Sequence, residues 1–163
     1  GQTSLKTLVD EPQFAIAWFL LSVLGEGTFL SLLWFIERYA PDPVTAAVAR
    51  LAAQDEARHV AFGLAHLTQH LARDPEFRPR LADAVRRRHD ALRHTAGLND
   101  EVFDALLLMA AGSWGHDALR QGSRRVAQLM HDMDEGRRKR LLRLGFSEKE
   151  AAELSALHTR NFM

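Results

Sequence analysis

Hydrophobic residues dominate the chain between Phe14 and Ile36, where Glu26 is the single charged residue. A helix that is apolar on all sides is typical of the centre of a helical bundle, so we predict a long helix from about Glu11 to Tyr39. The run is also long enough to cross a bilayer. A carboxylate at the centre of a membrane helix costs on the order of 3 kcal/mol, which favours the core helix over the membrane span.

The remaining chain alternates polar and apolar residues with helical periodicity, and nothing in it is typical of a strand. Helix starts are marked by an acidic or hydroxyl side chain that is followed by a proline or by an acidic residue. Pro41 and Gly97 mark two turns. These signals predict four further helices: from about Pro43 to Leu71, from Pro75 to His94, from Asp100 to about Glu135 with a bend at its glycines, and a short one after the capping box of Ser147 and Glu150.

The connection between the first two helices, residues 40–42, is so short that the helices must be antiparallel neighbours. Glu26 lies about 15 residues before the turn at Pro41, and Glu56 lies about 15 residues after it. Both helices rise by the same amount per residue, so the two carboxylates are expected at the same height of the hairpin.

Composition restricts the chemistry. The 163 residues fit one domain, with a hairpin at 11–72 and additional helices at 73–163. The chain has no cysteine, which excludes disulfides, thiolate metal ligands and cysteine nucleophiles and fits a cytoplasmic location. Lys and Arg balance Asp and Glu at 21 each, so net charge gives no support to nucleic-acid binding. The apolar run follows the acidic pair Asp10 and Glu11, which is unlike a secretory signal.

Glu26, Glu56 and His59 form the candidate metal site. Glu56 and His59 are three residues apart, so on a helix they project from one face and can bind the same ion. Glu26 would be strongly penalised in an apolar helix unless a cation neutralised it. Asp55 is a candidate acceptor for the other ring N–H of His59. The competing interpretation is an ion pair of Glu26 with Arg58 or another basic residue, with Glu56 and His59 as ordinary surface residues.

Residues 25–63, from Gly25-Glu26 to the Asp55-Glu56-x-x-His59 segment and on to Gly63, resemble the second helix pair of ferritin-like non-haem di-iron proteins, and most of all the oxygenase-type members. The resemblance implies an all-α, ferritin-like bundle with iron, or manganese, held by Glu26, Glu56 and His59. It further implies oxidation of a small organic substrate by O₂ in an apolar cavity around Phe19, Val23, Phe29 and Leu30.

A complete di-iron site of this family contains two such sets of ligands, and this sequence contains one. We therefore expect the other half from a second chain in a homodimer, from another polypeptide or from a missing N-terminal helix pair, and no nucleic-acid or membrane partner. Two further interpretations stay open at this point. One is a ferroxidase or iron-storage protein, and the other is a metal-free helical interaction protein.

Overall fold

The computed structural model describes residues 2–94 and 100–157, and every regular element within these ranges is a helix, as predicted. The turn expected at Gly97 lies outside the described residues. The elements follow in this order: α1 (Gln2–Val9), α2 (Phe14–Trp18), the π-helix η1 (Phe19–Glu26), α3 (Gly27–Tyr39), α4 (Pro43–Arg73), α5 (Phe77–Leu92), α6 (Asp100–Ala111), α7 (His116–Arg143) and α8 (Glu148–Ala156).

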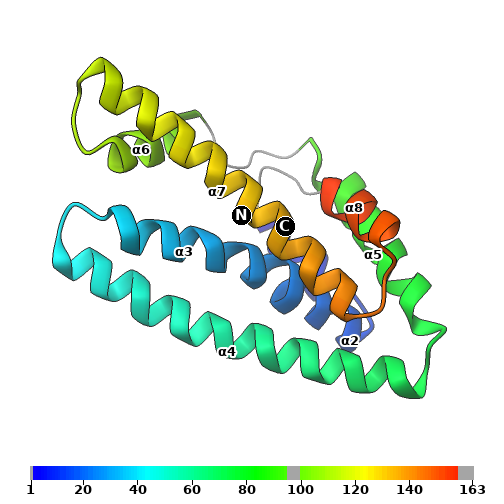
Figure 1. The fold of residues 1–163 in the computed structure, drawn as a ribbon. Coiled ribbons are helices and arrows are strands. Elements are labelled where there is room, and N and C mark those ends of the chain that lie inside the picture. The colour runs from blue at the N-terminus through cyan, green and yellow to red at the C-terminus, as the bar shows by residue number, and fades with distance from the viewer. Residues whose placement is uncertain (1, 95–99, 158–163) are drawn as a thin grey trace.

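The predicted antiparallel hairpin is present: α2, η1 and α3 run continuously in one direction, and α4 returns beside them (Figure 1). Asp42 starts α4, because its side chain accepts hydrogen bonds from the backbone N–H groups of Val44 and Thr45, each at 2.9 Å. Pro43 occupies the first helical position, where a missing N–H costs nothing. The local sequence around residue 42 therefore fixes the turn.

The first arm of the hairpin is not a uniform α-helix, which corrects the prediction. Residues Phe19–Glu26 form a π-helix, and the N–H of Gly27 is shared among the carbonyls of Ser22, Leu24 and Gly25. π-Helical segments occur mostly as short interruptions of α-helices and are frequent at functional sites. Apolar periodicity could not predict this one, because nearly every position in the run is apolar.

The single helix predicted from Asp100 to about Glu135 is wrong. The chain leaves α6 after Ala111, where Gly112 adopts a positive φ of 71°, and it re-enters a helix at His116. A φ in this region is accessible to glycine without steric cost. α7 then continues to Arg143, so two helices replace one bent helix. They lie side by side, with the tip of their hairpin away from α5 and α8 (Figure 1).

Smaller differences concern helix ends. α1 was not predicted, and α5 is shorter at both ends than the predicted Pro75–His94 helix. The capping box is confirmed, since Ser147 accepts from the backbone N–H of Glu150 while the Glu150 side chain accepts from that of Ser147.

Two groups of buried side chains hold the helices together. The larger joins η1 to α4, α5, α7 and α8, and the smaller joins α3 to α6 and α7. Phe19 and Val23 are fully buried in the larger group, so they are core residues and not the lining of an open cavity. The run Phe14–Tyr39 is long and apolar enough to span a membrane, a test that buried core helices also pass, and 56% of its most apolar window is buried here.

Candidate metal centre

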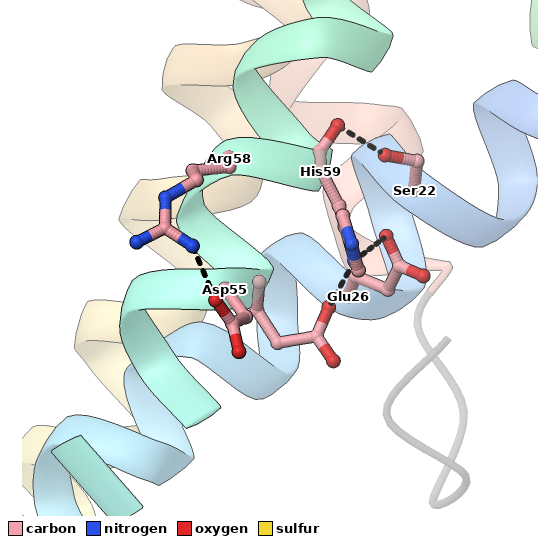
Figure 2. A network of polar contacts seen from close by, with 6 residues as sticks. Ser22, Glu26, Asp55, Arg58 and His59 are labelled. Atoms are coloured by element: carbon pink, nitrogen blue, oxygen red, sulfur yellow. Dashed lines mark hydrogen bonds and ion pairs between the residues drawn. The ribbon is translucent and has the colours of Figure 1, made fainter. Parts of the chain in front are cut away.

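The structure brings Glu26, Glu56 and His59 together. Glu26 is the last residue of η1, while Glu56 and His59 lie one turn apart on α4. His59 Nδ1 is 3.3 Å from Glu56 Oε2 and 4.0 Å from Glu26 Oε2. One ligand atom from each side chain lies within 4.8 Å of the others, close enough for all three to bind one ion after small rotations. Figure 2 shows His59 and Glu26 facing each other across the hairpin.

Two small residues let the arms of the hairpin approach at this height. A Cβ atom on Gly63 would lie 2.7 Å from Ser22 Oγ and 2.9 Å from Trp18 Nε1, so a larger residue there would force these side chains to move. The Ser22 hydroxyl donates a hydrogen bond to the backbone carbonyl of His59 at 2.9 Å (Figure 2). This bond ties η1 to the turn of α4 that carries the imidazole. Sequence reasoning missed Ser22, although a hydroxyl one turn before Glu26 in an apolar run was a signal.

α7 supports the other side of the π-helix. Arg140 Nε donates a hydrogen bond to the carbonyl of Val23 at 2.7 Å, and that carbonyl is outside the set shared by the Gly27 N–H. A Cβ atom on Gly27 would lie 2.4 Å from Arg140 Nε, so the guanidinium packs directly against the glycine. The arginine thereby satisfies a carbonyl next to the turn that ends in Glu26. Sequence reasoning did not predict this contact, because Val23 and Arg140 are more than 110 residues apart in the chain.

The environment of Glu26 favours a bound cation. Its Oε2 atom is buried and has no hydrogen-bond partner among the described residues. Burial raises the pKa of the Glu26 carboxyl, and the nearby Glu56 carboxylate raises it further. The Ser22 hydroxyl and His59 lower the pKa of Glu26 in part. Two neighbouring carboxylates, one of them with a buried oxygen that lacks a hydrogen bond, form a site that a positive ion would stabilise, because buried polar atoms normally have partners.

The site opens toward one side of the hairpin. The exposed fraction of the side chain rises from 23% for Glu26 to 31% for Glu56 and 58% for His59. The same side of α4 carries a stripe of exposed apolar side chains, which we call the α4 stripe: Val44, Val48, Leu51 and Phe62. The ligand cluster therefore borders exposed apolar surface of α4.

Arg58 does not pair with Glu26. Its guanidinium pairs with Asp55, one turn earlier on α4 (Figure 2). The ion-pair alternative for Glu26 therefore loses Arg58 as a partner, and the basic group at ion-pair distance from Glu26 is His59. The role of Asp55 as acceptor for the ring N–H of His59 stays a prediction.

The other histidines of α4 have aromatic neighbours. The His66 ring stacks on Phe62 with centroids 6.5 Å apart, and the His70 ring lies 4.3 Å from that of Phe77. Over the described residues, Glu26, Glu56 and His59 form the only cluster of three metal-ligating side chains. Comparisons with protein-family models, with curated proteins and with solved structures each gave no match to this chain.

Proposed function

We propose that this chain supplies half of a di-iron carboxylate centre that activates O₂ to oxidise a small organic substrate, with Glu26, Glu56 and His59 as its ligands. The observation that carries the proposal is the buried oxygen of Glu26, which has no hydrogen bond among the described residues and faces a Glu-x-x-His pair at ligand distance. Manganese is compatible with the same ligands, because oxygen and imidazole donors suit both metals.

The fold we propose for the assembly of two chains is a ferritin-like bundle. In such bundles two helices each supply a Glu and two others each supply a Glu-x-x-His motif, all pointing into the bundle. The α3–α4 hairpin with η1 provides one set, and its ligands border the α4 stripe. A second helix pair packed on that stripe would bury it and place its own ligands opposite His59. We propose that a second copy of the chain supplies this pair.

The roles of the residues follow from their positions. Glu26 and Glu56 provide negative charge and coordinating oxygens, and His59 provides a nitrogen donor at the exposed side. Phe29, 39% exposed, and the partly buried Leu30 extend the apolar surface from the next turn of the hairpin, where a covering partner would exclude water. A bound di-iron pair would supply the electrons that reduce O₂. The exclusion of water protects reactive oxidants from side reactions.

The first test is metal content. Anaerobic loading with Fe(II) followed by native mass spectrometry should show iron on the wild-type protein, two ions for two chains, and loss of that iron in Glu56→Ala. The matched control is Glu37→Ala, because Glu37 is an acid of the same hairpin that pairs with Arg50 at 4.0 Å, outside the cluster. Absence of Fe(II) and Mn(II) binding in the wild type, or equal binding in Glu56→Ala, would overturn the proposal.

The second test separates oxidation of a substrate from oxidation of iron alone. Ferrous protein is exposed to ¹⁸O₂ with a panel of small apolar organic compounds and excess ascorbate as the reductant, and the compounds are then analysed by mass spectrometry. An oxygenase inserts ¹⁸O into one of them, and Glu56→Ala abolishes that product. No labelled product, together with oxidation of Fe(II) and growth of an iron mineral when ascorbate is left out, would instead identify a ferroxidase and reject the organic substrate.

A further inference from the structure

A groove of about 530 Å³ lies between α3 and α7, outside the ligand cluster. It is lined by aromatic residues of α3 and by arginines of both helices, chiefly Trp34, Phe35, Arg38, Tyr39, Arg124 and Arg125. Sites for small organic ligands have volumes of about 300 to 1,000 Å³ and combine apolar walls with a few convergent polar groups. The groove has the size and the lining of such a site.

We propose that this groove binds a small carboxylate with an aromatic or aliphatic body. Its charge supports the choice of an anion, since the lining contains three arginines and one carboxylate, that of Asp132. Asp132 accepts a hydrogen bond from the Gln128 amide at 2.8 Å, which occupies one of its oxygens. Within the described ranges, no carboxylate lies within ion-pair distance of Arg38, Arg124 or Arg125. The groove is therefore lined by more positive than negative side chains, and its three guanidinium groups form no ion pair within the described ranges.

The tyrosine at the end of α3 holds two of the guanidinium groups in place. Arg38 lies 5.6 Å and Arg125 4.9 Å from the centre of the Tyr39 ring, both within the range of cation–π contact. Arg125 also donates a hydrogen bond to the backbone carbonyl of Ala110. Such contacts leave further N–H groups of each guanidinium able to donate. Arginine binds carboxylates with two parallel hydrogen bonds, so a carboxylate fits these groups well.

The apolar wall fits the body of the ligand. The Trp34 side chain is 41% exposed although it lies in the groove, while Phe35 and Leu129 are buried beneath it. An exposed indole beside guanidinium groups offers a flat face for an aromatic ring or an alkyl chain. The combination of this face with Arg38 and Arg124 selects an amphipathic anion over an inorganic one.

The groove is separate from the proposed metal centre. Glu37 faces α4, as its ion pair with Arg50 shows, whereas Phe35 and Tyr39 pack in the group that joins α3 to α6 and α7. The groove thus uses the side of α3 away from α4. Binding there can be tested on metal-free protein, so its outcome is independent of the proposal for Glu26, Glu56 and His59.

The test measures binding of 1-naphthoate and of its neutral analogue 1-naphthamide by isothermal titration calorimetry. The variants are Arg124→Gln, with Arg120→Gln as the matched control, because Arg120 lies one turn earlier on α7 and is outside the lining. We expect Arg124→Gln to weaken naphthoate binding about tenfold, as loss of a charge-assisted hydrogen bond does, and to leave naphthamide binding unchanged. Arg120→Gln should change neither.

A third variant tests the apolar wall. Trp34→Ala should weaken binding of both naphthoate and naphthamide, because both use the indole face. Since Trp34 and Arg124 are exposed, the variants should keep their circular dichroism spectra and melting temperatures. The proposal is overturned if wild-type protein shows no saturable naphthoate binding, or if Arg124→Gln and Arg120→Gln bind naphthoate as tightly as the wild type does.

Discussion

Arg140 on α7 donates a hydrogen bond from Nε to the backbone carbonyl of Val23 in η1, at 2.7 Å, and its guanidinium packs against Gly27. Burial lowers the pKa of Arg140 to about 10, with a further contribution from Arg137. A buried cation is costly unless it has polar partners, and here a backbone carbonyl of the π-helix serves as one. The geometry that ends in Glu26 therefore depends on a side chain from a distant helix.

The contact between Gly27 and Arg140 predicts the effect of a methyl group. Gly27→Ala places a Cβ atom 2.4 Å from Arg140 Nε, so it should destabilise the protein by about 2 kcal/mol, as overpacking does. In the Arg140→Ala background the clash is gone. There Gly27→Ala should stabilise the protein by up to about 1 kcal/mol through higher helix propensity.

This double-mutant cycle is measured by urea unfolding of four proteins: the wild type, Gly27→Ala, Arg140→Ala and the variant with both substitutions. The reversal of sign between the two backgrounds is the specific result, because a general intolerance of residue 27 would give the same loss in both. Equal destabilisation in the presence and absence of the arginine would contradict the packing described here.

The position of Glu26 leads us to predict that its carboxylate lowers the stability of the metal-free protein but is required for metal binding. Its carboxylate is partly buried beside Glu56, and burial, followed by the charge of Glu56, raises its pKa and disfavours the charged form. Glu26→Gln removes that charge and should raise the melting temperature of metal-free protein by about 3 °C. The same variant should lose Fe(II) binding, because an amide is a poorer ligand than a carboxylate.

Differential scanning fluorimetry with and without Fe(II), under argon, tests both halves of this prediction. Glu37→Gln is the control: it breaks the ion pair with Arg50 and should not stabilise the protein. A lower melting temperature of metal-free Glu26→Gln would show that the carboxylate stabilises the fold by itself.

The α4 stripe predicts self-association. Val48 and Leu51 are 62% and 54% exposed, and burying each in an interface contributes about 2 kcal/mol. Val48→Lys combined with Leu51→Lys should therefore weaken association by at least about a hundredfold. Light scattering across a range of concentrations, with and without Fe(II), measures it. Val9→Lys, at an 84% exposed position of α1, serves as control. A wild-type protein that stays monomeric with iron bound would show that the second helix pair is not a second copy.

Asp42 predicts a dependence of stability on pH. Hydrogen bonds from Thr45, side chain first and backbone second, lower the pKa of Asp42 below its usual 3.8. A lowered pKa in the folded state means that its contribution to stability is present above pH 3.8 and is lost as the pH falls through the folded-state value. Asp42→Ala should therefore melt below the wild type at pH 7, and the difference should shrink toward pH 2.

Asp42→Asn is the matched variant for this measurement, since asparagine caps helices but does not titrate. Its melting curve should differ from that of the wild type mainly in pH dependence. A difference between the wild type and Asp42→Ala that is constant from pH 7 to pH 2 would exclude the carboxylate as the origin of the effect.

The sequence by itself determined the helical class, the hairpin and the meeting of Glu26 with Glu56 and His59. Short connections and helix caps are local signals in the sequence. A tight turn at Pro41 requires the two helices that it joins to lie side by side. Equal rise along both arms then sets which residues face each other. The same local chemistry determined the cap of α8 at Ser147.

Tertiary structure decided the rest, because the remaining features depend on contacts between distant residues. The π-helical geometry of η1 accompanies a hydrogen bond from Arg140, and the pairing of Arg58 with Asp55 instead of Glu26 depends on side-chain direction. The break after Ala111 coincides with the positive φ of Gly112. The sequence contains several glycines in this region and does not show which of them ends the helix. The groove that contains Trp34 and Arg124 exists only because α7 packs along α3. Local sequence encodes how each helix starts and ends, whereas the partners of its buried polar groups are set by the packing of the whole chain.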